Sequence, residues 1–111
     1  MTIFALSSGP GVSGVAVIRI SGPQTAKALK KLTNKEIPKP RVATLRKINN
    51  INTSELIDEG IIIWFPGPES YTGEDMAEIH VHGGKAVVIS VQNEISKIEN
   101  LSLIHISEPT R

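Results

Sequence analysis

The pattern of apolar and polar positions along the chain predicts five strands and two helices. Segments typical of strands are rich in β-branched residues or alternate between apolar and polar positions. They span residues 3–7, 15–20, 41–48, 56–65 and 76–82. Apolar residues at spacings of three and four predict helices over 21–32 and 85–98. In the first helix we expect Ser21 at or just before the N-cap and Pro23 in the first turn.

The order β-β-α-β-β-β-α predicts an α+β fold, with a single mixed sheet and two main helices packed mainly on one face. The 111 residues are enough for one small domain with a core of its own. No cysteine occurs, so disulfides and thiolate metal sites are excluded. We see no secretory leader and no run of 18 apolar residues, so we expect a cytoplasmic protein without a membrane segment.

Arg19 occupies an unusual place near the end of an otherwise apolar strand. Successive side chains of a strand point to opposite faces, so Arg19 shares a face with Val15 and Val17. A buried guanidinium needs a carboxylate or an anionic ligand, because an unpaired buried charge costs several kcal/mol. An ion pair within the domain and a ligand contact are both open readings of this residue, and Glu78 is the natural candidate partner.

The segment 76–82 predicts one polar and one apolar strand face. Glu78, His80 and His82 alternate with apolar residues that we expect to pack against a helix. Two histidines two positions apart, with the glutamate as a third ligand, match a zinc site. The alternative is that one histidine bonds to backbone and the other borders a cleft. Gly83 and Gly84 end the strand.

Charge gives little indication of a partner. The chain has 12 Lys and Arg, 11 Asp and Glu, and a net charge of +1, so nothing in the total suggests electrostatic wrapping of nucleic acid. The first helix is basic on its outer side, where we expect a solvated surface. The residues concerned are Lys27, Lys30, Lys31 and the nearby Lys35.

Three longer stretches resemble one known family. They are GVAVIRISGPQTAKAL (14–29), IPKPRVATLRKI (37–48) and LIDEGIIIWFPGPESYTGEDMAEIHVHGG (56–84). Together they resemble the N-terminal domain of the tRNA modification GTPase MnmE (TrmE) family, from about Ile3 to about Ile98. The combination of R-I-S-G-P, F-P-G-P-x-S-Y-T-G-E-D and H-G-G in this order is specific to that family.

The resemblance implies a fold similar to the tetrahydrofolate-binding domain of the glycine-cleavage aminomethyltransferase. It implies binding of 5-formyl- or 5,10-methylene-tetrahydrofolate and formation of a homodimer. Full-length members act with the partner MnmG to modify C5 of the wobble uridine in certain tRNAs. Their GTP, Mg²⁺ and K⁺ belong to a GTPase domain that this chain lacks, so we do not expect it to be catalytic alone.

Carried over residue by residue, the folate contacts implied by the family fall on Arg19 and Glu78. A carboxylate can accept hydrogen bonds from two neighbouring N–H groups on the edge of a pterin. Arg19 can donate to carbonyl or carboxylate oxygens of the folate. Weaker candidates for the same pocket are Tyr71, His82, Gly83 and Gly84.

The chain departs from the family pattern in two places. Members often carry an arginine in the first glycine loop, where this chain has Val12, so we assign no anion contact to that loop. The ending NLSLIHISEPTR differs from the family's continuation. We therefore divide the chain into a domain at 1–100 and a divergent tail at 101–111 that is not native continuation. The alternative is a divergent last strand of the same sheet at 103–106.

Three functional hypotheses follow from these observations. The first is a folate-binding and dimerisation module of a tRNA-modifying GTPase. The second is an interaction domain that binds no ligand. The third is a small metal-binding domain that uses Glu78, His80 and His82.

Overall fold

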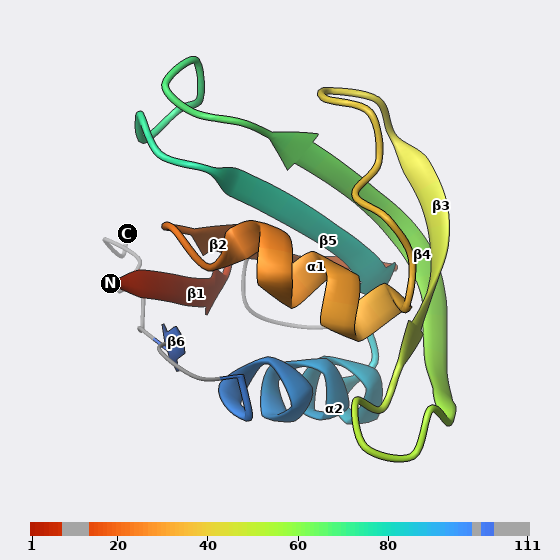
Figure 1. Cartoon of the computed structure of the whole chain (residues 1–111). Coiled ribbons are helices and arrows are strands. Elements are labelled where there is room, and N and C mark those ends of the chain that lie inside the picture. Colours follow the sequence, from red (N-terminus) through yellow and green to blue (C-terminus); the bar gives the residue numbers. More distant parts are fainter. Residues whose placement is uncertain (8–13, 99–100, 104–111) are drawn as a thin grey trace, which may run out of the picture.

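The computed structural model describes residues 1–7, 14–98 and 101–103, and these ranges hold six strands and two helices (Figure 1). The elements are β1 (Thr2–Leu6), β2 (Val15–Ser21), α1 (Thr25–Thr33), β3 (Thr44–Asn49), β4 (Leu56–Phe65), β5 (Met76–His82), α2 (Lys85–Ser96) and β6 (Leu101–Leu103). The five predicted strands and both predicted helices are present, with shifts at their ends.

The strands form one mixed sheet in the order β3-β4-β5-β2-β1-β6. Neighbouring strands are antiparallel except β1 and β6, which are parallel. The predicted α+β fold with a single mixed sheet is therefore confirmed. Since β2 pairs with β5 rather than with β3, the centre of the sheet joins segments that are far apart along the chain.

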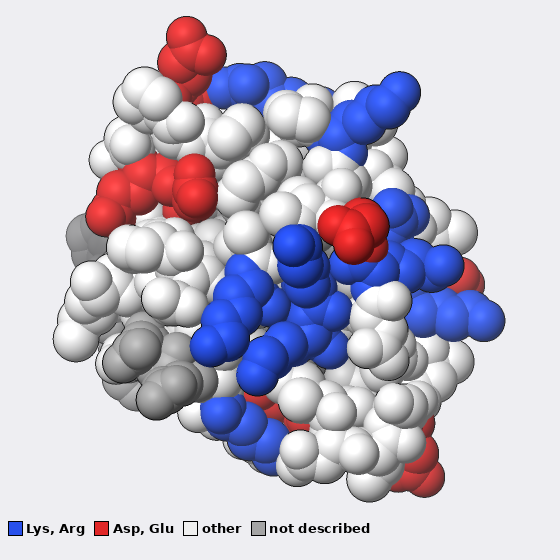
Figure 2. All heavy atoms as spheres, viewed as in Figure 1, with Lys and Arg blue, Asp and Glu red and all other residues white. Residues whose placement is uncertain are grey.

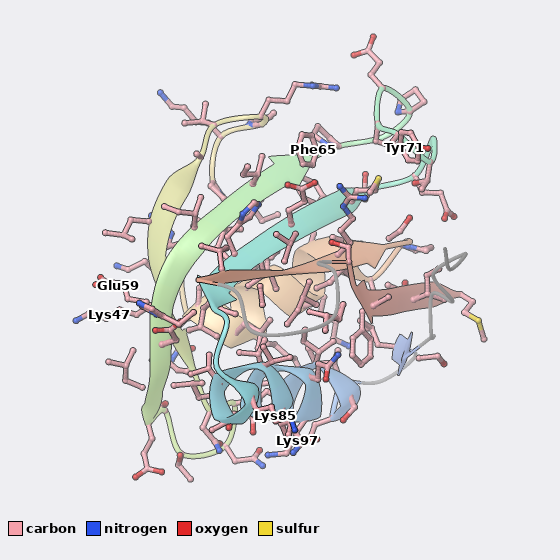
Figure 3. The ribbon with its side chains drawn as sticks, turned by 180° about the vertical axis from the view of Figure 1, so that it is seen from behind. Lys47, Glu59, Phe65, Tyr71, Lys85 and Lys97 are labelled. Carbon is pink, nitrogen blue, oxygen red and sulfur yellow. The ribbon has the colours of Figure 1, made fainter. Side chains whose placement is uncertain are left out.

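Both helices cover one face of the sheet, as Figures 1 and 3 show from opposite sides. The core lies between these layers, where each fully buried large aliphatic side chain contributes about 1.5–3 kcal/mol. It includes Ile18, Ile20, Ile62 and Ile79 from the sheet and Leu29, Leu32, Val91 and Ile95 from the helices. In the part of the chain that the structure describes, neither helix is long and apolar enough to cross a membrane.

The first helix begins later than the sequence predicts. Ser21 is the last residue of β2, where it pairs with Met76, so its backbone belongs to the sheet rather than to a helix cap. Gly22 then turns the chain at φ 138°, a left-handed value that favours glycine. The N-cap is Gln24 and Pro23 precedes it, so the predictions for Ser21 and Pro23 were wrong. The Thr25 hydroxyl donates to the Gly22 carbonyl at 2.7 Å.

Two other boundaries also differ from the prediction. The strand predicted from residue 41 begins at Thr44, because Arg41 has φ 62° and is not extended. Before it, Pro40 makes only an isolated bridge to Trp64. The second helix ends at Ser96 rather than at residue 98. A tight turn follows, in which the N–H of Ile98 donates to Ile95, so Ile98 still reaches the core.

A buried carboxylate connects α2 to the turn between β3 and β4. Glu94 is 4% exposed and accepts hydrogen bonds from the Ile51 N–H at 2.9 Å and from Asn50 Nδ2 at 3.3 Å. Its second oxygen also accepts from Lys97 Nζ at 2.8 Å. Burial alone would raise the pKa of Glu94, but the bonds from Lys97 and Ile51 outweigh it and lower that pKa.

The start of the predicted tail contributes a strand. Residues 101–103 form β6 and pair with β1 at the edge of the sheet. The alternative interpretation of the tail was a last strand at 103–106. Residues 104–106 lie outside the described residues, and so do residues 107–111. Val12 lies outside them as well.

Candidate functional site

Arg19 and Glu78 face each other across the central strands of the sheet. The antiparallel register of β2 and β5 places them directly opposite. Alternation along each strand leaves both on the face that carries no helix, since Ile18, Ile20, Ala77 and Ile79 on the other face are fully buried. The predicted division of the segment 76–82 into an apolar and a polar face is therefore confirmed, and Arg19 lies on the same side of the sheet as that polar face.

The two side chains form an ion pair, and a histidine bonds to the same carboxylate. Arg19 Nε donates to Glu78 Oε2 at 3.2 Å, and His80 Nε2 donates to Glu78 Oε1 at 3.0 Å. The ion pair within the domain that the sequence left open for Arg19 is therefore present, although the Arg19 side chain is 49% exposed rather than buried. Glu78 is the more enclosed partner at 19%. Each carboxylate oxygen accepts one of these bonds and keeps a lone pair for another donor.

A cleft of about 440 Å³ opens beside this pair. Its lining combines the two charged groups with aromatic and polar side chains. The lining residues are Arg19, Phe65, Glu69, Ser70, Tyr71, Met76 and Glu78. Figure 3 shows Phe65 and Tyr71 at the same end of the molecule, where the loop between β4 and β5 begins and turns back.

Local hydrogen bonds hold the loop that carries Tyr71. The Asp75 carboxylate accepts from the Gly67 N–H at 2.9 Å. The hydroxyls of Ser21 and Thr72 bond to each other at 2.9 Å, which joins the loop to the end of β2. Tyr71 itself is 93% exposed, so its ring is available at the mouth of the cleft.

His82 lies away from this cleft, on a different carboxylate. Its backbone N–H and ring Nδ1 donate to Asp58 at 2.9 and 2.8 Å. Burial alone would raise the pKa of Asp58, but these bonds outweigh it and lower that pKa. Gly83 bonds to Gly14 and Gly84 is the N-cap of α2. The structure thus brings Tyr71 to the Arg19–Glu78 cleft and places His82, Gly83 and Gly84 outside it.

The metal reading finds no support in the geometry. His80 and His82 are bonded to different carboxylates, Glu78 and Asp58. Among residues 1–7, 14–98 and 101–103 there is no group of three His, Cys, Asp or Glu placed to hold a metal ion. A second hollow of about 390 Å³, lined by Met1, Thr2, Pro23, Gln24 and Ser102, has no ionisable side chain.

Sequence reasoning missed part of the lining and the partner of His82. Alternation along β4 separates Phe65 from Trp64, but only the pairing of β4 with β5 shows that Phe65 shares a face with Glu78. Asp58 likewise reaches His82 only because β4 and β5 run side by side.

Comparison with known proteins gives one consistent family. Residues 2–109 match the family described as "GTP-binding protein TrmE N-terminus". The chain is 65% identical over 111 residues to the tRNA modification GTPase MnmE of Pelagibacter ubique. The match covers all of this chain and 25% of that protein.

Mitochondrial relatives are also similar. The chain is 48% and 47% identical to the 5-taurinomethyluridine-[tRNA] synthase subunit GTPB3 of Danio rerio and of Homo sapiens. These matches cover 99% of the chain and 22–23% of those proteins. The chain thus spans about a quarter of the length of the curated relatives that it matches. It belongs to the TrmE (MnmE) N-terminal domain family.

Proposed function

We propose that this domain binds a reduced folate, 5-formyl- or 5,10-methylene-tetrahydrofolate, in the cleft beside Arg19 and Glu78. The larger protein would act as a homodimer together with MnmG, and it would use the bound folate to modify C5 of the wobble uridine of tRNA. A cytoplasmic location is part of this proposal. The observation that carries it is the half-exposed Arg19–Glu78 pair at the side of a cleft of about 440 Å³.

The chemistry of the cleft suits a pterin. Pockets for small molecules have volumes of roughly 300–1,000 Å³ and combine apolar walls with a few placed polar groups. Phe65 and Met76 supply apolar surface, and the exposed Tyr71 can stack on a flat ring. Glu78 retains a lone pair on each oxygen for two adjacent N–H donors, while Arg19 remains a donor for a carbonyl or carboxylate.

Calorimetry with 5-formyltetrahydrofolate tests this proposal. Glu78→Gln removes the charge but keeps the shape, and losing hydrogen bonds to a charged acceptor costs about 1.5–3 kcal/mol. We therefore expect affinity to fall roughly tenfold to a hundredfold. The control is Glu59→Gln, the same change on an exposed residue that Figure 3 shows far from Tyr71. Equal affinity in both variants and the parent chain would place the ligand elsewhere.

A second role, dimerisation, is favoured by exposed apolar residues on the helix-free face. Leu45 is 57% and Val15 is 53% exposed, and both line one shallow hollow with Ile61. Removing such surface from water on association is favourable. Light scattering should give a dimer that Leu45→Glu weakens. A domain that dimerises but shows no heat with millimolar folate would serve interaction alone.

A further inference from the structure

The net charge of +1 conceals a strong segregation of charge along the chain. Residues 27–46 contain seven of the 12 Lys and Arg but one of the 11 Asp and Glu, so this segment carries +6 and the rest carries −5. The expectation that nothing suggests binding of nucleic acid was based on the net charge of the whole chain. A local excess of this size creates a potential that the total does not describe.

Folding places much of this charge on one surface. The buried side of α1 is formed by Ala28, Leu29 and Leu32, which turns the lysines of the helix outward. Lys27, Lys30 and Lys31 stand three and four positions apart and so share that outer side. Figure 2 shows Lys and Arg gathered over α1 and the neighbouring edge of the molecule. Lys35 joins them, since it lines the same shallow hollow as Lys30.

Arg46 extends this surface on the strand beside the helix. It lies on β3, which packs against α1, and it belongs to the same side of that strand as the buried Ile48. Its Nε is buried without a hydrogen-bond partner among the described atoms. We call the outer side of α1 with Lys35 and Arg46 the basic face, made of Lys27, Lys30, Lys31, Lys35 and Arg46.

Little within the described chain neutralises the basic face. Its only ion pair among residues 1–7, 14–98 and 101–103 joins Lys30 to Glu36 at 4.0 Å, and Glu36 is 93% exposed there. Lysines in the last turn of a helix complement its dipole, which accounts for Lys30 and Lys31. It does not account for Lys27, Lys35 or Arg46. Four exposed lysines held close together repel one another unless an anionic partner joins them.

We propose that the basic face binds the phosphate backbone of RNA directly. This inference rests on the proposed role of the larger protein in tRNA modification, and it assigns RNA contact to the domain itself. Protein interfaces have apolar centres, whereas nucleic-acid interfaces are polar and strongly positive. The exposed residues of the basic face are lysines, and the exposed Leu45 lies on the opposite side of β3 from Arg46. Lysine amines and arginine guanidinium groups are the donors that proteins commonly use to bind phosphate oxygens.

Fluorescence anisotropy with a fluorescein-labelled tRNA transcript tests the proposal. About four phosphate contacts give a slope of about −3 for log K against log salt. We therefore expect affinity to fall about 60-fold between 50 and 200 mM salt. A slope near zero would overturn the proposal. Polyglutamate and vesicles containing 20% phosphatidylserine are the comparison probes, and tighter binding to either of them than to the transcript would also overturn it.

Matched single variants locate the surface. Lys31→Gln should reduce the salt slope by about 1, and the affinity about sixfold at 100 mM salt. Lys85→Gln is the same change on an exposed residue at the start of α2 and should have no effect. Glu36→Gln should tighten binding, a gain that misfolding cannot produce. Equal effects of Lys31→Gln and Lys85→Gln, or no gain from Glu36→Gln, would refute the assignment.

Failure here is distinguishable from failure of the folate proposal. Glu78→Gln should leave tRNA binding unchanged, because Glu78 lies on the face of the sheet opposite the helices. Lys31→Gln should in turn leave the folate affinity unchanged. Loss of both activities in either variant would indicate one shared surface and would contradict the separate basic face.

Discussion

The Glu94 carboxylate offers a direct test of how this fold is stabilised. Glu94→Gln keeps the size of the side chain and one acceptor oxygen but removes the charge. In the parent chain that charge receives bonds from Ile51, Asn50 and Lys97. Hydrogen bonds to charged groups contribute about 1.5–3 kcal/mol, and the amide group would also bring its own donor against Asn50 or Lys97.

We expect Glu94→Gln to lower the free energy of unfolding by about 2 kcal/mol at pH 7. An unfolding entropy of about 2.1 cal/mol/K per residue converts this loss to about 9 °C in Tm. Urea titration and thermal melting measure the two quantities. Glu55→Gln is the control, because Glu55 is exposed on the same turn and surface changes usually stay within about 0.5 kcal/mol.

The effect should depend on pH in a defined direction. The pKa of Glu94 is lowered in the folded chain, so its stabilisation is present at neutral pH and is lost as pH falls through that folded pKa. Below it, the protonated side chain resembles glutamine, and the difference between parent and variant should vanish. A difference that persists unchanged after the Glu94 carboxyl of the folded parent chain has been protonated, or a loss no larger than that of Glu55→Gln, would refute the reasoning.

Two further predictions concern the sheet. Asp58→Asn should cost about 1 kcal/mol at pH 7 in urea titration, because the bonds from His82 lose their charged acceptor. Since the pKa of Asp58 is lowered, that cost should disappear as pH falls through it, and a cost that grows in acid would contradict the assignment. Gly60→Ala should cost at least about 3 kcal/mol, because its Cβ would collide with the carbonyl oxygen of His80. Gly84→Ala, where a Cβ meets nothing within 4 Å, should melt close to the parent chain, and similar melting of both variants would show the close approach to be wrong.

Local pattern predicted the two faces of the central strands because alternation is a property of the strand itself. Alternation placed Arg19 and Glu78 each on one face of its own strand and made Glu78 a candidate partner of Arg19, and the direct pairing of the two across β2 and β5 agrees with this. The start of α1 was mispredicted for a tertiary reason. Ser21 and Pro23 have good helix-capping chemistry, but pairing of Ser21 with Met76 extends β2 through that position.

Contacts between elements could not be read from the sequence. Glu94 sits in an amphipathic helix pattern as an ordinary polar residue, and only the docking of the β3–β4 turn makes it a buried acceptor. In the sequence Asp58 is likewise one acidic residue among several, and only the packing of β4 beside the end of β5 brings it to His82. The basic face was recognised as a charged helix surface, but Arg46 joined it only through the packing of β3 against α1. Sequence patterns thus predict which face a residue occupies, and tertiary packing determines what it meets there.

The pairing of β2 with β5 has a consequence for how the domain assembles. Arg19 and Glu78 are 59 positions apart, so the two halves of their site come together only when a long stretch of chain has closed into a loop. Such distant pairings form slowly, because the entropy of closure is lost before the contacts are gained. A ligand bound beside β2 and β5 would therefore stabilise a pairing between distant segments, and amide protons along both strands should exchange more slowly in its presence.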